Sequence, residues 1–234
     1  MQRAAGMGEP SRAAVEQEFQ YLRRTVFNAH VTTYTRDVSA SAIGIHEPSA
    51  GDLRFIFRSG RLCLAFCATV GERWRRGFER LRTPDDLARW YAEAAVAGTP
   101  VPVTGADLDH ARVVREAIYR GAKALIAGGA PAAGDEAIIN QAAAAPPPVP
   151  RLEAGAVTLT PARPDPAASA LSAVARDAID LLAGPRAARL RECASPQCGL
   201  LFLDVSRPGR RRWCSSNACG GQARAAAYRQ RRAR

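Results

Sequence analysis

Apolar residues recur every three or four positions in several stretches of the chain, and this period is typical of amphipathic helices. Four helices are predicted in the central part, over about residues 83–98, 104–128, 135–145 and 165–184. Three of them begin with residues that favour a helix start: Thr83-Pro84, Thr104 with Asp107, and Asp165-Pro166. Glycines or prolines follow all four segments and end them. A further helical pattern covers residues 12–27.

Strand-like patterns are shorter. Residues 53–58 alternate with a period of two and predict a strand, followed by a turn at Ser59-Gly60. Residues 62–70 form an almost unbroken apolar run, which must be buried either as a strand or as the start of a helix. Its two cysteines, Cys63 and Cys67, are expected to be small buried hydrophobic residues.

A β-hairpin is predicted between residues 148 and 164, with Ala154-Gly155 at its turn. Leu152, Val157 and Leu159 are expected to face inward. The main domain is therefore expected to be α+β, mostly helical with a short hairpin. The expected divisions are an N-terminal extension, the helical domain and a C-terminal segment, at residues 1–50, 51–185 and 186–234.

Composition supports a folded chain, because 47% of the 234 residues are apolar. No apolar run reaches the eighteen or so residues of a membrane span, and the first twenty residues lack the apolar segment of a secretion signal. We therefore expect a cytoplasmic protein without a membrane segment. Charge is concentrated at one end: from Arg186 onward there are twelve arginines and two acidic residues, so this part carries +10 of the total +11.

The same basic segment contains two pairs of cysteines, Cys193 with Cys198 and Cys214 with Cys219, and fifteen residues separate the pairs. Two close pairs joined by a loop suit a tetrahedral zinc ion, and four cysteines leave no open position for catalysis, so one structural Zn²⁺ is predicted. Disulfides and unrelated buried cysteines are the alternatives. Disulfides are disfavoured because cytosolic thiols stay reduced, and unrelated burial is disfavoured because the segment has little core of its own.

Around these cysteines, strands are expected at residues 199–203 and 210–213, with a turn at 206–209 between them, and a helix follows Cys219. The expected fold class is thus α+β: a mostly helical main domain with a short hairpin, plus a small C-terminal zinc finger, treble-cleft-like or ribbon-like, that ends in a basic helix. Guanidinium groups bind phosphates well. The candidate nucleic-acid contacts are Arg210, Arg211, Arg212, Arg224, Arg229, Arg231 and Arg232. Trp213 is expected to pack in the finger, and Tyr228 either to pack there or to touch a sugar-phosphate edge.

Two regions resemble known families. Arg212-Trp213-Cys214, the four-residue gap and Cys219-Gly220 before an Ala/Arg-rich helix resemble the CGNR zinc finger, which typically closes stress-induced bacterial transcription regulators. Residues 60–69 and 81–87 are similar to its usual partner, the ABATE domain. The sequence departs from both patterns. Gly221 and Gln222 replace the Asn and Arg that name the finger, and Ala65 and Ala68 replace an acidic residue and an asparagine.

The resemblance implies a transcription regulator whose finger binds DNA and whose helical domain senses a ligand or dimerises. The alternative is a zinc-stabilised module that binds RNA or an acidic protein surface without sequence-specific DNA binding. We do not expect an enzyme, because the sequence has no Ser/His/Asp pattern, no phosphate-cradling glycine-rich loop and only three histidines. The oligomeric state is left open, a homodimer included.

Overall fold

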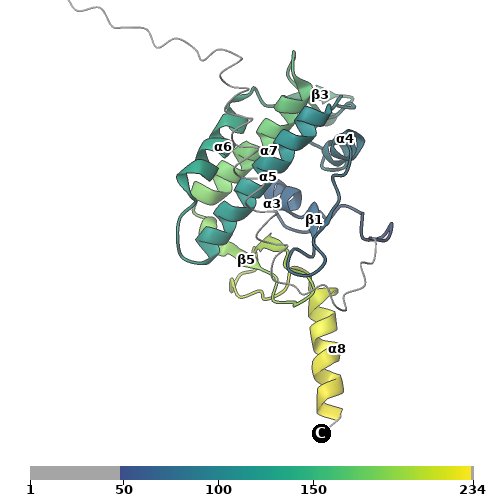
Figure 1. Ribbon diagram of the computed structural model, residues 1–234, viewed down its shortest axis with the longest axis vertical. Helices are drawn as coiled ribbons and strands as arrows, with labels where there is room; N and C mark the ends of the chain where they lie inside the picture. The colour runs from purple at the N-terminus through teal and green to yellow at the C-terminus, as the bar shows by residue number, and fades with distance from the viewer. Residues whose placement is uncertain (1–47, 233–234) are drawn as a thin grey trace, which may run out of the picture. The chain divides into compact units, whose positions relative to one another are not determined.

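Three helices, α5, α6 and α7, pack side by side and make up most of the helical part of the protein (Figure 1). They span Gly105–Ile126, Ala133–Ala144 and Pro166–Ala183 in a computed structural model that describes residues 48–232. A short helix, α3 (Leu62–Cys67), packs against α5 and α7, and α4 (Pro84–Glu93) packs against α5. We call residues 48–189 the body and residues 190–232 the finger.

The predicted helix starts are confirmed. Thr83 and Thr104 both form capping boxes, in which the threonine side chain accepts a backbone hydrogen bond and an aspartate three residues later reaches back. Asp165 caps α7 by accepting a hydrogen bond from the amide of Ala168. The stabilisation from such caps is about 1 kcal/mol each.

Helix α4 ends at Glu93 rather than near Gly98 as predicted. Ala95 takes a left-handed conformation with φ of 52°, and the amide of Val96 donates to the carbonyl of Tyr91 over 3.0 Å. This is the Schellman arrangement, here formed with alanine instead of the usual glycine. It turns the chain early, so that Val96 is buried in the core.

The strand predicted at residues 53–58 is wrong, because this segment consists of turns and irregular backbone. Its alternation has another cause: Phe55 packs against the main core, whereas Ile56 packs against a smaller cluster around the finger cysteines. The following apolar run is the helix α3, and Cys63 and Cys67 are buried in it as expected. Burial raises the pKa of Cys67 to about 12, so its thiol stays protonated.

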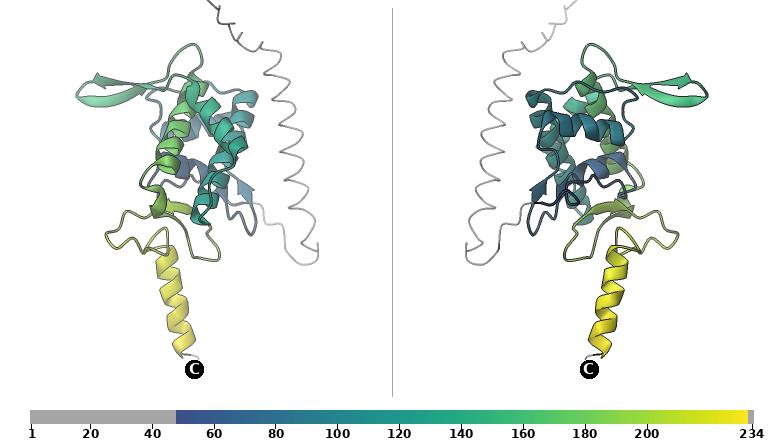
Figure 2. Two further views of the ribbon diagram at one scale, coloured as in Figure 1. Left: turned by 90° about the vertical axis from the view of Figure 1, so that its left-hand side faces the viewer. Right: turned by 90° about the vertical axis from the view of Figure 1, so that its right-hand side faces the viewer.

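Strands β1 (Val70–Gly71) and β2 (Phe78–Glu79) form a short antiparallel pair next to α3. The predicted hairpin is also present, as β3 (Val149–Glu153) and β4 (Ala156–Thr160). Two of its three expected inward side chains are exposed: Leu152 is 79% exposed and Val157 is 74% exposed, whereas Leu159 is partly buried. The reason is that the hairpin extends away from the helices (Figure 2) and its two strands pair only with each other among residues 48–232, while the carbonyl of Leu159 accepts a hydrogen bond from the amide of Gly98.

In the finger, β5 (Leu190–Glu192) pairs antiparallel with β6 (Leu201–Leu203), and the helix α8 spans Cys219–Arg232. A single turn of 3₁₀ helix, η2 (Ala187–Arg189), leads into β5. The strand predicted at residues 199–203 is thus confirmed, but the returning strand at 210–213 is wrong. The amide of Arg211 donates to the carboxylate of Asp204 instead of to a strand, so no ladder forms there.

The finger is part of the protein's main core. Leu190, Leu201 and Leu203 are buried in the same apolar cluster as the body helices, and the amide of Leu203 donates to the carbonyl of Ser59 over 2.9 Å. Lys123 of α5 pairs with Glu192 of β5. These contacts fix β5 and β6 against the body.

The α+β fold class is confirmed for residues 48–232: helices dominate, and the strands form three small antiparallel pairs. The helix predicted at residues 12–27 lies outside the described residues. None of the helices in the described part combines the length and apolar character that crossing a membrane would require.

Candidate metal centre

The first cysteine pair lies in a tight loop between β5 and β6. The amide of Cys193 donates to the carbonyl of Leu200 over 2.9 Å, and the amide of Cys198 donates to the carbonyl of Ser195 over 3.0 Å. Gly199 follows with φ of 61°, and a Cβ atom there would lie 2.3 Å from the indole nitrogen of Trp74. Glycine is therefore required at position 199 for two reasons. The backbone there is left-handed, and the indole of Trp74 leaves no room for a side chain.

The second pair lies where an extended segment meets α8. Cys214 ends that segment, and Cys219 is the first residue of the helix. Between them the side chain of Ser215 accepts a hydrogen bond from the amide of Ala218, and its carbonyl accepts one from the amide of Gly220. These bonds satisfy amides at the start of α8 and point Cys219 toward the other cysteines.

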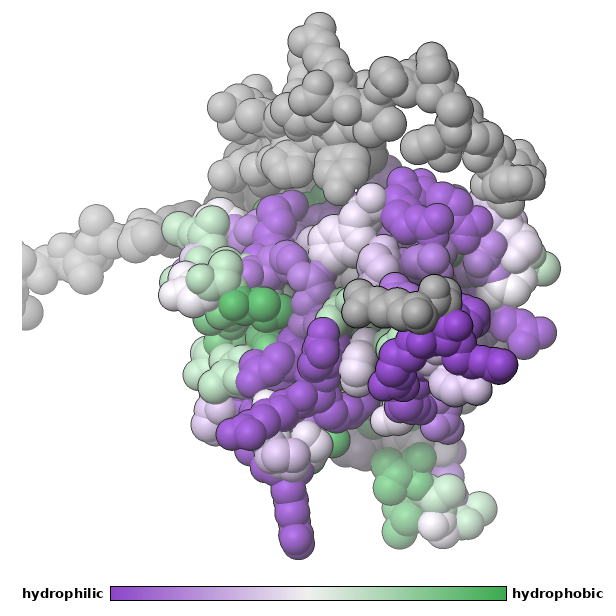
Figure 3. Space-filling view, turned by 90° about the horizontal axis from the view of Figure 1, so that it is seen from below, coloured by the Kyte–Doolittle hydropathy of each residue, from purple (hydrophilic) through white to green (hydrophobic). Residues whose placement is uncertain are grey.

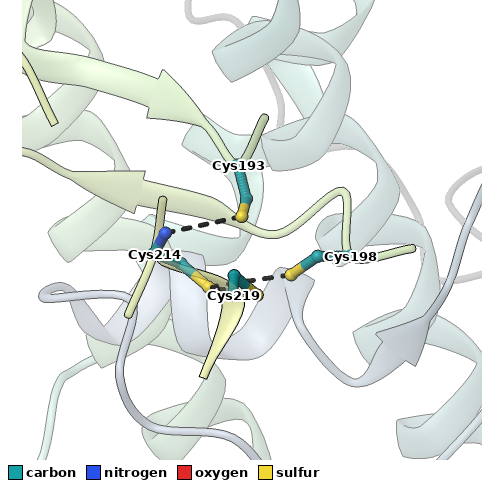
Figure 4. Close-up of side chains that lie close together, drawn as sticks. All are labelled: Cys193, Cys198, Cys214 and Cys219. Atoms are coloured by element: carbon teal, nitrogen blue, oxygen red, sulfur yellow. Dashed lines mark hydrogen bonds between the residues drawn. The ribbon is translucent and has the colours of Figure 1, made fainter. Parts of the chain in front are cut away.

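All four sulfur atoms lie within 4.8 Å of one another (Figure 4). The Sγ atom of Cys214 is 3.6 Å from that of Cys198 and 3.7 Å from that of Cys219. Zinc–sulfur bonds of about 2.3 Å in a tetrahedron require sulfur atoms about 3.8 Å apart. The geometry therefore fits one zinc ion held by Cys193, Cys198, Cys214 and Cys219.

The thiols are already coupled electrostatically. Hydrogen bonding with Cys214 lowers the pKa of Cys198 to about 5, and the same contact raises the pKa of Cys214. Burial raises the pKa of Cys219 to about 11. Zinc binds thiolates, so these protons must leave when the metal binds, and zinc binding is expected to depend on pH.

Arg58 of the body brings a positive charge to the cluster. Desolvation lowers its pKa, but attraction to the nearby Cys214 and Cys198 outweighs that effect and raises the pKa overall. A zinc ion with four thiolates carries a formal charge of −2, which Arg58 partly balances. With four cysteine ligands the metal has no open position, so the zinc is structural.

The arginines before Cys214 have different surroundings. Arg210 and Arg212 are exposed, whereas Arg211 lies over the ring of Phe202 and donates to the carbonyl of Cys214 over 2.8 Å. Arg212 lies over the ring of Trp213, which packs in the cysteine cluster as predicted. The guanidinium of Arg211 therefore serves the finger's own structure.

The remaining candidate arginines are all on α8 and all exposed; they are Arg224, Arg229, Arg231 and Arg232. Tyr228 is 55% exposed, so it does not pack in the finger. Apart from Cys219 and Gly220, α8 has no buried residue, and Figures 1 and 2 show it extending away from the rest of the finger. When the molecule is viewed from the C-terminal end of α8, the surface around the helix is mostly hydrophilic (Figure 3).

The positions that depart from the family patterns lie at the edges of the site. Gly221 and Gln222 are in the first turn of α8, partly and fully exposed respectively. Ala65 is buried in the main core, and Ala68 is buried in the cluster around the cysteines. None of the four is a metal ligand, because the cysteines alone provide the ligands.

Two residues important for the site were not predicted from the sequence. Asp204 is 1% exposed and accepts hydrogen bonds from the amides of Ser206 and Arg211. Burial raises the pKa of Asp204, but these bonds outweigh it and bring the pKa below its usual value. The Asp-x-Ser pattern before a Pro-Gly turn is a detectable signal for this role. No sequence pattern indicated the role of Arg58, because it is far from the cysteines along the chain and only the fold brings it close to them.

Comparison with known families supports the assignment. Residues 60–185 match the ABATE family, described as "Putative stress-induced transcription regulator", and residues 189–232 match the CGNR zinc finger. No curated protein matches the sequence. Since the first match covers more than half of the chain, this protein belongs to the ABATE family, and it carries a CGNR zinc finger after that domain.

Proposed function

We propose that the finger binds duplex DNA through the arginines of α8 and that the protein regulates transcription. The observation that carries this proposal is the one-sided charge of the C-terminal part. Residues 205–234 contain nine arginines and no acidic residue. Such a segment attracts the phosphate backbone strongly and independently of sequence.

The geometry of α8 supports this role. Its fourteen residues make a rod about 21 Å long. At 100° per residue, Arg224, Arg231 and Arg232 lie within an arc of about 100°, and alanines occupy much of the opposite side. A helix of this kind fits the major groove, which is about 12 Å wide.

The zinc supplies rigidity. It fixes the first turn of α8 to the loop of Cys193 and Cys198, so the arginines project from a defined position. Arg212 is exposed beside that turn, Arg210 is exposed two residues earlier in the chain, and together they add two charges. Because the metal has no open coordination position, we also propose that the protein has no catalytic activity at this centre.

Binding of the full-length zinc-loaded protein to a fluorescent DNA duplex, measured by anisotropy over a range of salt, tests the proposal. If about five arginines meet phosphates, the slope of log affinity against log salt is about −4 to −5. No binding even at low salt would refute it. Stronger competition by structured RNA or an acidic protein than by DNA would favour an interaction module instead.

A matched pair of variants locates the surface. Replacing Arg229, Arg231 and Arg232 by alanine should weaken binding at least 100-fold at low salt and reduce the slope by about 3. The control replaces three exposed body arginines, Arg82, Arg151 and Arg163. The two triple variants have the same net charge. Equal losses of DNA affinity would therefore mean that net charge alone, not the finger, drives binding.

A further inference from the structure

A cavity of about 240 Å³ lies where the body meets the finger, and we call it the junction cavity. Arg58, Val70, Phe78 and Arg80 of the body line it, and Leu200 is among its finger residues. It is distinct from the metal centre, although Cys198 and Cys219 border it. Its walls therefore combine arginines with apolar side chains.

The most unusual group in the junction cavity is the guanidinium of Arg80. The residue is only 5% exposed, and within residues 48–232 no carboxylate lies within ion-pair distance of it. Its Nη1 atom donates to the carbonyl of Ala68 over 2.8 Å, but its buried Nε atom has no hydrogen-bond partner. A buried charge without a counter-ion is costly, so this arginine needs an anion.

The backbone makes room for this charge. A Cβ atom at Gly71 would lie 2.8 Å from the Nη1 atom of Arg80 and 2.4 Å from the ring of Phe78. The guanidinium also lies over that ring, 4.7 Å from its centre. Any larger residue at position 71 would push Arg80 out of its position in the cavity wall.

The carboxylates of the junction cavity are already engaged. Glu72 accepts from Arg76 over 2.9 Å, and Asp52 accepts from the same guanidinium over 3.5 Å. A further arginine of the wall, Arg73, binds the carboxylate of Glu116 with two hydrogen bonds. Among residues 48–232, these pairs leave Arg80 and Arg58 as the arginines of the cavity wall without a carboxylate, and Arg58 also faces the thiols of the metal centre.

Arg58 and Arg80 also repel each other. Desolvation lowers the pKa of Arg80, and repulsion from Arg58 adds to this effect, although Asp52 and Glu79 oppose it. An anion between the two guanidinium groups would satisfy the free Nε–H and remove the repulsion. Guanidinium groups bind carboxylates and phosphates in this way.

We propose that the junction cavity binds a small organic anion, whose carboxylate or phosphate group contacts Arg80 and Arg58. Its apolar part would lie against Val70, Phe78 and Leu200. The volume holds the equivalent of about eight water molecules at roughly 30 Å³ each, and it is below the range of about 300–1,000 Å³ for drug-sized ligands. The volume therefore suits a compact metabolite.

Such a ligand touches the body and the finger at once, so binding stabilises the packing of one against the other. The experiment measures thermal unfolding of the full-length zinc-loaded protein without nucleic acid, which keeps it independent of DNA binding. Sodium phosphate and sodium benzoate are the two probes, and sodium chloride at equal ionic strength is the reference. At ten times the dissociation constant, a bound probe raises Tm by about 3–5 °C.

Two variants assign the effect. Arg80→Met should abolish the stabilisation by either probe and should melt at or above the wild-type temperature without a probe, because it removes an unpaired buried charge. Arg82→Met, an exposed neighbour, should respond as the wild type does. Stabilisation by phosphate alone or benzoate alone identifies the preferred anion.

Other outcomes overturn the proposal. If neither probe stabilises the wild type, or if Arg80→Met responds equally, the junction cavity is not an anion site. If Arg80→Met melts well below the wild type and neither probe acts, Arg80 serves only to hold the carbonyl of Ala68 in place.

Discussion

Loss of the zinc should destabilise the body as well as the finger. Zinc fixes the loop between β5 and β6, and these strands bury Leu190, Leu201 and Leu203 in the main core. We expect Cys214→Ser to remove the metal, because three cysteines remain where a closed tetrahedral site needs four ligands. The strands then lose the constraint that holds their leucines against α5 and α3.

The size of the effect follows from the burial of these leucines. Each is at most 3% exposed. Full burial of a leucine side chain is worth about 1.5–3 kcal/mol, so together they contribute about 4–9 kcal/mol as an upper bound. Net stabilities of domains are only about 5–15 kcal/mol. Loss of even half of this burial free energy lowers Tm by about 5–15 °C.

Circular dichroism at 222 nm suits this prediction, because α5, α6 and α7 supply most of the helical residues. Wild type, wild type with a chelator, and Cys214→Ser should be compared. The last two should melt together, at least 5 °C below the first. Helices that melt at the wild-type temperature in both zinc-free samples would refute the shared core as a source of stability.

Three other predictions concern single positions. Gly199→Ala should cost about 2–4 kcal/mol in urea unfolding, because of its positive φ and the clash with Trp74, whereas Gly105→Ala, with open space around it, should cost nothing. Glu116 has a pKa of about 2, since hydrogen bonds and charges of two arginines outweigh its desolvation. Its stabilisation is therefore complete above about pH 5 and is lost as pH falls toward 2. Glu116→Gln should cost about 1–2 kcal/mol at pH 7, after allowance for solvent screening, and the difference should narrow below pH 4.5. Leu152→Ala should change the free energy of unfolding by less than about 0.5 kcal/mol, because the side chain is 79% exposed; a loss of 2 kcal/mol or more would mean that the hairpin is covered in solution.

Local signals in the sequence predicted the helices well. Capping residues and helical periodicity need only neighbours in the chain, and Thr83, Thr104 and Asp165 start helices as expected. The four cysteines could be predicted for a similar reason: close pairs with a short loop between them have few other uses. Both features depend on spacing within a few residues.

The errors arose where an apolar residue has a partner far along the chain. The alternation of residues 53–58 suggested a strand, but Phe55 and Ile56 face two separate clusters, one of them built by the finger. Leu152 and Val157 are apolar but remain mostly exposed. Apolar patterning shows that a side chain is hydrophobic, whereas its partner depends on the tertiary structure.

The structure also changes how the finger relates to the rest of the protein. A basic finger on a flexible linker would bind phosphates independently of its body. Here β5 and β6 belong to the body's core, and Trp74 lies against Gly199. Helix α8 is joined to the finger by its first turn at the zinc and by the hydrogen bond from Arg224 to the carbonyl of Ser216. Any change in the packing of body against finger therefore moves the direction in which the arginines of α8 project. The junction cavity lies on this boundary, where the proposed ligand would alter the proposed DNA binding without touching α8 beyond its first turn.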